Sequence, residues 1–315
     1  MQSREENFYI YLGMPTLFIL LSFLLSILSG CTKTETTPPR KVSHAKVLVI
    51  GVVPEERMFR ETERYQPLAD YLSKKVGTRI ELKVLTAYGN AVDNFSSLSL
   101  DGAFFGSFAY ALAHSKLGVE VLVRPEYLNG VSTYHGLIFV RRDSGIKTAR
   151  DMRGKRFVFV DKATTAGYLL PLAYFEKHGI KNYKTYLRET YFAGTHEDAI
   201  MDVLNKKADI GSAKNTIYER MTKDDNRIEK ELMILEKSPD VPENGLAMRN
   251  DVDDLIKKEL KDALLNMHND PEGISVLKNF GVRRFIETTD KDYDPVYKYI
   301  KDIGLNLATY DYINE

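Results

Sequence analysis

The sequence predicts an α/β protein with two similar lobes. From residue 46 onward, runs with the composition of buried strands alternate with stretches whose apolar residues recur at helical spacing. The alternation occurs in two series, and a helix followed by a short strand beside an aspartate occurs in both, at 90–107 and 197–212. Such βα order favours a mostly parallel sheet with helices on both faces. Its repetition favours two lobes over one long sheet. The alternative is that the two series resemble each other by chance.

The first series opens with a Val- and Ile-rich run at 47–53, which predicts a buried strand. Leu68, Leu72 and Val76 then form a helical stripe over 65–76 that ends at Gly77. The remaining predicted elements are a strand at 79–85, a helix at 90–98, a strand at 102–105, a helix at 107–117 and a strand at 119–123.

The second series has the same character. Its predicted elements are a strand at 157–160, a helix at 166–178, a strand at 190–192, a helix at 196–206, a strand at 208–211 and a helix at 216–221. Two extended stretches, 134–142 and 232–236, are candidate crossovers between the lobes. Three C-terminal helices, at 251–267, 271–280 and 294–303, are expected to pack mainly on the first lobe.

Composition excludes several classes of function. Lys plus Arg and Asp plus Glu both number 44, so no global field attracts nucleic acid, and no nucleic-acid partner is expected. Cys31 is the only cysteine, which rules out an intramolecular disulfide and a cysteine metal site. The six histidines lack metal-ligand spacing, and no catalytic triad is evident. We therefore expect no metal, no cofactor and no catalytic residues.

The N-terminal segment predicts the compartment. An apolar run over 8–28 leads directly into Leu28-Ser29-Gly30-Cys31, which resembles the lipobox of bacterial lipoproteins. The prediction is a signal peptide at 1–30, a lipid on Cys31, and a polar, lipid-anchored tether at 31–45. An uncleaved transmembrane anchor is the alternative, because about 20 apolar residues can span a bilayer. Both interpretations place the folded part outside the cytoplasm and attach it to the membrane.

Several short segments resemble a known family when taken in order. They are GVVPE at 51–55, QPLADYL at 66–72, TY at 133–134, DSGI at 143–146, DKATTAGY at 161–168, AGTH at 193–196 and SPDVP at 238–242. Over nearly all of 46–281 the chain looks like the phosphate, phosphite and phosphonate receptors of ABC importers, the PhnD-like type II periplasmic binding proteins.

The resemblance implies two Rossmann-like lobes joined by a two-stranded hinge. Lobe 1 would comprise 46–137 and 238–315, and lobe 2 would comprise 138–237. It implies a monomeric extracytoplasmic receptor that closes on a small oxyanion and delivers it to an ABC permease. Three alternatives remain at this point: a sensory receptor domain, a receptor for a non-phosphorus anion, and an enzyme on the same fold.

The resemblance also implies a set of ligand-binding residues. They are Tyr88, Phe105, Ser107, Tyr134, Thr164, Thr165, Ala166, His196, Lys214 and Asn244. Thr164 and Thr165 open a helix directly after a strand, where free N–H groups and hydroxyls can hold an oxyanion. The family usually has Ser-Thr-Ser there, so one hydroxyl is missing at Ala166. An ordinary helix cap is the alternative.

For the other positions, the resemblance assigns roles one by one. The Tyr88 hydroxyl would contact the anion, unless Tyr88 is only a partly exposed aromatic. Phe105 has lost the hydroxyl that relatives often carry, and Ser107 would supply a donor instead. A His196 ring N–H would donate to the anion, unless His196 only caps or packs its helix.

Lys214 and Asn244 bear on the choice of ligand. Amine-binding relatives place acidic residues here, whereas this chain has Thr216 and Asn244, with Lys214 nearby. We therefore expect an oxyanion without an amino group to bind better than aminoethylphosphonate, since Lys214 would repel an ammonium. The alternative is that Lys214 is a solvated surface charge.

Overall fold

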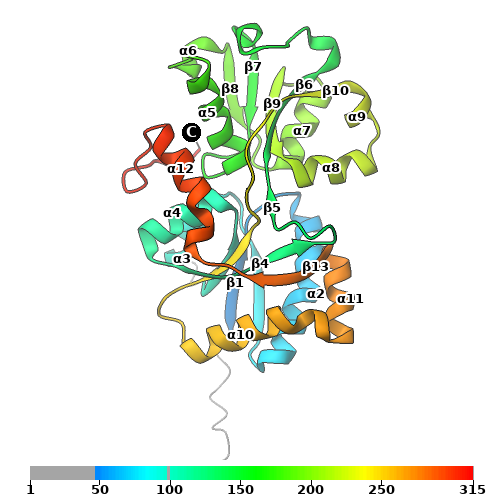
Figure 1. The fold of residues 1–315 in the computed structure, drawn as a ribbon, viewed down its shortest axis with the longest axis vertical. Helices are drawn as coiled ribbons and strands as arrows, with labels where there is room; N and C mark the ends of the chain where they lie inside the picture. The colour runs from blue at the N-terminus through cyan, green and yellow to red at the C-terminus, as the bar shows by residue number, and fades with distance from the viewer. Residues whose placement is uncertain (1–46, 98–99, 315) are drawn as a thin grey trace, which may run out of the picture. The chain divides into compact units, whose positions relative to one another are not determined.

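The computed structural model describes residues 47–97 and 100–314, so the predicted signal peptide, tether and Cys31 lie outside the described residues. The strands form a six-stranded sheet (β13-β4-β12-β3-β1-β2), a five-stranded sheet (β10-β6-β9-β7-β8) and a two-stranded ladder (β11-β5). Figure 1 shows helices around each large sheet and β5 between the two. The predicted α/β class, with two lobes and a two-stranded hinge, is confirmed.

The first sheet combines an N-terminal parallel part with strands from the second half of the chain. Strands β1 (Leu48–Val52), β2 (Ile80–Val84) and β3 (Gly102–Phe105) are parallel, because α2 and α3 return the chain between them. Strand β12 (Gly245–Met248) enters antiparallel between β3 and β4 (Glu120–Tyr127). The helices of this part are α2 (Met58–Val76), α3 (Asn90–Ser97), α4 (Ser107–Leu117), α10 (Asp254–Asn266) and α11 (Pro271–Phe280), and the edge strand β13 is Val282–Glu287.

The second sheet repeats the plan. Strands β7 (Arg156–Phe159), β8 (Glu189–Phe192) and β9 (Ile210–Lys214) are parallel, β6 (Gly136–Arg141) pairs antiparallel with β9, and β10 (Leu232–Lys237) pairs antiparallel with β6. A π-helical turn η3 (Thr165–Leu169) leads into α5 (Leu170–Lys177). The other helices are α6 (Tyr183–Tyr186), α7 (His196–Leu204), α8 (Asn215–Asp224), α9 (Arg227–Glu231), η1 (Arg142–Ser144) and η2 (Ala149–Met152).

The predicted crossovers were largely wrong. Most of 134–142 and all of 232–236 form β6 and β10, which pair with each other inside the second sheet. The chain instead changes sheets at β5 (Thr133–Tyr134) and β11 (Val241–Pro242), which pair with each other. Apolar, extended sequence indicates a strand, but it does not say which strand will lie beside it.

Helix α2 starts seven residues before the predicted position, despite Pro67 in its interior. A proline inside a helix removes a hydrogen bond and costs about 3 kcal/mol. Here Glu61, Tyr65, Leu68 and Leu72 are all buried along one helix face. Burial of that face in the first lobe's core offsets the cost, so the helix continues through the proline.

The C-terminal part belongs to both lobes. Helices α10 and α11 pack on α2 of the first lobe, as predicted, whereas α12 (Asp294–Asp302) contacts both α4 and η3 (Figure 1). After α12, the Tyr310 hydroxyl donates to the Lys162 carbonyl (2.7 Å), and the Tyr310 ring lies 5.4 Å from that of Phe108. Two 3-10 turns complete this part, η4 (Met267–Asn269) and η5 (Asp290–Tyr293). None of the helices in the described part of the chain is both long and apolar enough to cross a membrane.

Candidate functional site

Polar side chains from both lobes meet where the parallel strands end. Glu55 follows β1, Tyr88 follows β2, Asp161 follows β7, Lys214 ends β9 and His196 begins α7. All five are buried, with at most 5% of each residue exposed. The carboxyl ends of parallel strands are where α/β folds place ligand sites. We therefore take this cluster as the candidate site.

Lys214 is enclosed by acceptors. Its Nζ donates to Glu55 Oε1 (2.7 Å), to Glu243 Oε1 and to Asn244 Oδ1 (3.2 Å). Burial lowers the pKa of Lys214, but the charges of Glu243 and Glu55 outweigh it and hold that pKa well above its usual value. Burial alone would likewise raise the pKa of Glu55, yet Lys214 and Arg64 lower it to about 2.

Two expectations for Lys214 are therefore wrong. It is neither a solvated surface charge nor a cation beside neutral residues only, because two buried carboxylates contact it. Asn244, at the position where amine-binding relatives have an acidic residue, is neutral, as expected. Glu243, directly before it, is the acidic residue that contacts Lys214. Glu55 and Glu243 are residues of the candidate site that were not predicted from the sequence.

His196 is fixed as a neutral ring with a defined tautomer. Its Nδ1 accepts a hydrogen bond from the Lys214 backbone N–H (3.2 Å), and its own backbone N–H donates to the Glu55 carbonyl (3.1 Å). Burial lowers the pKa of His196 to about 3, with the Glu55 charge opposing the shift and Lys214 adding to it. Because Nδ1 is an acceptor, the ring proton sits on Nε2. His196 thus keeps one N–H to donate.

Two of the buried donors that have no partner within the described residues lie close together: the Tyr88 hydroxyl and Asn244 Nδ2. The two residues are 2% and 5% exposed, and burial holds the pKa of Tyr88 well above its usual value, so its hydroxyl stays protonated. Both flank Gly106, the residue that begins α4, because a Cβ there would lie 3.7 Å from Asn244 Oδ1 and 4.0 Å from Tyr88 Cε1. An unpartnered buried polar group costs about 1–3 kcal/mol, so this pair is suited to an acceptor from outside the chain.

The hydroxyls expected to form the main anion seat have partners in the protein. Thr164 donates to the Asp161 carbonyl (2.6 Å), and Thr165 Oγ1 accepts from the Phe108 N–H (3.0 Å) in the first turn of α4. The Thr164 hydroxyl therefore contacts the turn before η3, and it does not cap the helix as the alternative supposed. Thr165 links the second lobe to α4, and Ala166 can offer only its backbone N–H.

The remaining candidates divide between hinge and core. Ser107 Oγ donates to the Pro242 carbonyl (2.5 Å) and lies 3.2 Å from the Tyr134 hydroxyl. The Tyr134 ring lies 4.4 Å from Lys214 Nζ. The Phe105 ring, by contrast, is fully buried and stacked on Phe95, with 5.3 Å between ring centroids. Phe105 is thus a core residue. It lacks the hydroxyl that relatives often carry at this position, and its ring packs in the apolar interior.

Asp161 is a third residue that the sequence analysis missed. Its Oδ1 accepts from the Ala163 N–H (2.8 Å), and its Oδ2 accepts from Asn314 Nδ2 (2.9 Å). The carboxylate also accepts the backbone N–H groups of Tyr88 and Gly89. A carboxylate of the second lobe therefore holds the loop that carries Tyr88. An aspartate directly after a predicted strand was the available signal.

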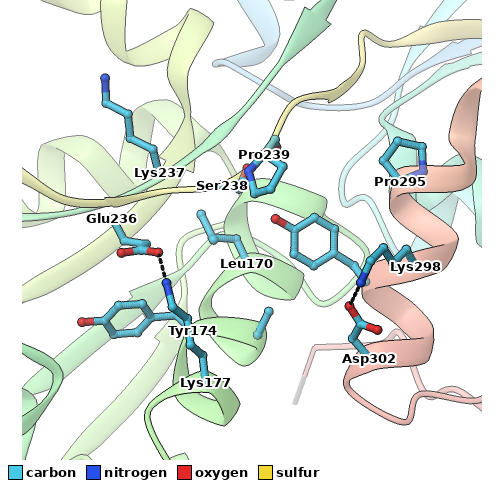
Figure 2. A pocket seen from close by; sticks show the side chains of 12 residues that line it. Leu170, Tyr174, Lys177, Glu236, Lys237, Ser238, Pro239, Pro295, Lys298 and Asp302 are labelled. Carbon is cyan, nitrogen blue, oxygen red and sulfur yellow. Dashed lines mark hydrogen bonds and ion pairs between the residues drawn. The ribbon is translucent and has the colours of Figure 1, made fainter.

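Two cavities near this cluster differ in the residues that line them. One of about 490 Å³ opens beside the Lys214 network, and its lining includes Glu55, Arg64 and Thr216. Another, of about 270 Å³, lies beside the hinge between α5, β10 and α12, where Lys177 pairs with Glu236 and Lys298 with Asp302 (Figure 2). Two of the three lysines that line this second cavity, Lys177 and Lys298, are already paired with carboxylates, which makes it a weaker candidate for an anion site. Across residues 47–97 and 100–314, no three His, Cys, Asp or Glu side chains are grouped to hold a metal ion.

Comparison with known proteins identifies related chains. Residues 50–293 match the family model described as "ABC transporter, phosphonate, periplasmic substrate-binding protein". The phosphonates-binding periplasmic protein of Escherichia coli K12 is 24% identical over 268 residues, 84% of this chain and 78% of that protein.

Two solved structures share the fold. A binding protein component of an ABC phosphonate transporter from Pseudomonas aeruginosa has a TM-score of 0.77 at 22% identity, covering 82% of this chain and 87% of that one. PhnD1 from Prochlorococcus marinus, in complex with methylphosphonate, has a TM-score of 0.73 at 19% identity, covering 82% and 98%.

Proposed function

Because this chain belongs to the periplasmic substrate-binding family of phosphonate ABC transporters, we propose that it captures a small phosphorus oxyanion outside the cytoplasm for delivery to an ABC permease. One observation carries the proposal at the level of residues. The Tyr88 hydroxyl and Asn244 Nδ2 are buried donors that find no partner in the described part of the chain, and they flank the start of α4.

The chemistry of this place suits an oxyanion. Tyr88 and Asn244 offer one neutral donor each, and His196 offers its Nε2–H. Helix α4 spans 11 residues and directs the positive end of its dipole towards Gly106. A phosphoryl group has three oxygens that can accept from these donors, and such charge-assisted bonds are stronger than neutral ones.

Binding is coupled to closure of the two lobes. Thr165 of the second lobe bonds to α4 of the first, and Asp161 of the second lobe bonds to the Tyr88 loop of the first. A ligand that contacts His196 and Tyr88 together adds to these bonds only when the lobes are closed. The short hinge ladder of β5 and β11 can absorb the rotation, and the closed form is the one the permease would recognise.

We also propose that Cys31 carries a lipid that tethers the receptor to the membrane. The proposal rests on Leu28-Ser29-Gly30-Cys31 after the apolar run and on the chain's membership of a periplasmic family. Growth with labelled palmitate tests it. Label should enter the wild-type protein and be absent from Cys31→Ser, and an unlabelled wild type contradicts the anchor.

A thermal-shift screen tests the proposed ligand class. Methylphosphonate, phosphite and phosphate are compared with sulfate and acetate at matched ionic strength. A ligand at about 100 times its Kd should stabilise the protein by roughly 2.7 kcal/mol. Stabilisation by sulfate or acetate alone would point to a receptor for a non-phosphorus anion.

A further inference from the structure

The ammonium group of Lys214 occupies a complete cation site. Its three N–H groups face Glu55 Oε1, Glu243 Oε1 and Asn244 Oδ1, and the Tyr134 ring lies 4.4 Å from Nζ. Two carboxylates, an amide oxygen and an aromatic face are the groups with which proteins bind alkylammonium ions. The residue is 1% exposed, so solvent has no part in this site.

The charges around Lys214 balance. Glu55 also lies 3.8 Å from Arg64 Nη1, so Glu55 and Glu243 face two cations, Arg64 and Lys214. Without the lysine ammonium, Glu55 would still have Arg64 as an ion-pair partner. Glu243 would be left as a buried carboxylate without a cation. A buried unpaired charge is strongly unfavourable, so such a site would favour an external ammonium.

This cation site adjoins the proposed anion site through one side chain. Asn244 accepts from Lys214 with Oδ1, while its Nδ2 has no partner within residues 47–97 and 100–314. The two atoms of an amide lie about 2.3 Å apart. Because Nζ lies 3.2 Å from Oδ1 and a hydrogen bond from Nδ2 spans about 3 Å, an ammonium at the position of Nζ and an oxyanion on Nδ2 would be less than about 8.5 Å apart, so one short aminoalkylphosphonate could contact both.

We propose that Lys214 is the specificity-determining residue of the ligand site, an internal occupant of a subsite for alkylammonium groups. The inference rests on the proposed function, because it concerns which phosphorus oxyanions the same site accepts. With Lys214 in place, aminoalkylphosphonates are excluded because the ammonium subsite is full. Without its side chain, the receptor accepts them.

The direct test is Lys214→Ala, which removes the ammonium together with the side chain that would otherwise fill the subsite. Calorimetry compares 2-aminoethylphosphonate with methylphosphonate on the full chain. The ratio of their dissociation constants should shift at least tenfold in favour of 2-aminoethylphosphonate relative to wild type. The matched control is the double variant Lys214→Ala/Glu243→Gln, which lacks the carboxylate left without a cation and should lose the gain.

Methylammonium chloride provides a readout that needs no phosphonate. It should raise the thermal stability of Lys214→Ala above the effect of equal sodium chloride, and should not do so for wild type or the double variant. If Lys214→Ala folds only with methylammonium present, the subsite is supported. If it shows neither stabilisation by methylammonium nor the shift in ligand ratio, the inference is overturned. Wild type that binds no phosphorus oxyanion defeats the proposed function, while the methylammonium result still decides the subsite.

Discussion

Replacing Tyr88 by phenylalanine should change stability and binding in opposite directions. In the ligand-free protein the Tyr88 hydroxyl is buried without a partner among the described residues. Its removal should stabilise the protein by about 1 kcal/mol, because an unpartnered hydroxyl loses its solvation on folding. For a chain of this size that corresponds to a rise in Tm of roughly 2–4 °C.

The same substitution should weaken ligand binding. A hydrogen bond from a hydroxyl to a charged oxyanion contributes about 1.5–3 kcal/mol, which is roughly a 10- to 150-fold change in Kd. Thermal unfolding without ligand and calorimetry with the strongest-binding phosphorus oxyanion measure the two effects separately.

Tyr110→Phe is the matched control. Tyr110 is 1% exposed, but its hydroxyl donates to Asp290 Oδ1 (3.0 Å). Its loss should destabilise the protein by about 1 kcal/mol and leave Kd unchanged. A Tyr88→Phe protein that is less stable than wild type and binds equally well would refute the assignment of Tyr88 to the ligand.

Three further perturbations test other parts of the structure. Thr165→Val removes the acceptor of the Phe108 N–H, so it should weaken ligand affinity about five- to tenfold by disfavouring the closed form, and unchanged affinity by calorimetry would exclude that role. Burial, reinforced by the charge of Glu55, raises the pKa of Glu61 from 4.5 to about 7. The contribution of Glu61 to the free energy of unfolding is therefore full below pH 4.5 and is lost as the pH rises through 7. Glu61→Gln should therefore be more stable than wild type by up to roughly 3 kcal/mol above pH 7, and should differ little from wild type near pH 4. Urea unfolding at the two pH values measures this. An equal stability difference between variant and wild type at both pH values would mean that the pKa of Glu61 is not raised. Wild type should bind methylphosphonate more tightly than 2-aminoethylphosphonate in competition calorimetry, and the reverse order would mean that Lys214 leaves the ammonium subsite open.

Much of the fold could be predicted from local sequence. Strand β3 was placed at its observed residues, and the end of α4 at Gly118 follows from a glycine with φ of 66°. It was harder to predict which strands pair with each other. β6 and β10 were recognised as extended, yet their assignment to one sheet depends on neighbours that no local pattern specifies. Strand β13 was missed because its register with β4 is irregular, so the alternation that marks a strand is interrupted.

The candidate site could be predicted in part. Tyr88, His196 and Asn244 lie together around the start of α4 and the end of β9, as the resemblance implied. Sequence reasoning could not foresee that Glu55 and Glu243, 188 positions apart in the chain, would enclose the ammonium of Lys214. The error on Lys214 has the same origin, because a lysine viewed alone is most often solvated.

The most direct measurement for the central claim is calorimetric titration of the purified protein with methylphosphonate, phosphite and phosphate. The proposed function predicts one site per chain and, for at least one of these anions, a Kd of about 10 μM or tighter. It also predicts that this binding weakens in Tyr88→Phe. No saturable binding of any of the three up to about 1 mM would contradict the proposal that the buried donors at the start of α4 exist to hold a phosphorus oxyanion.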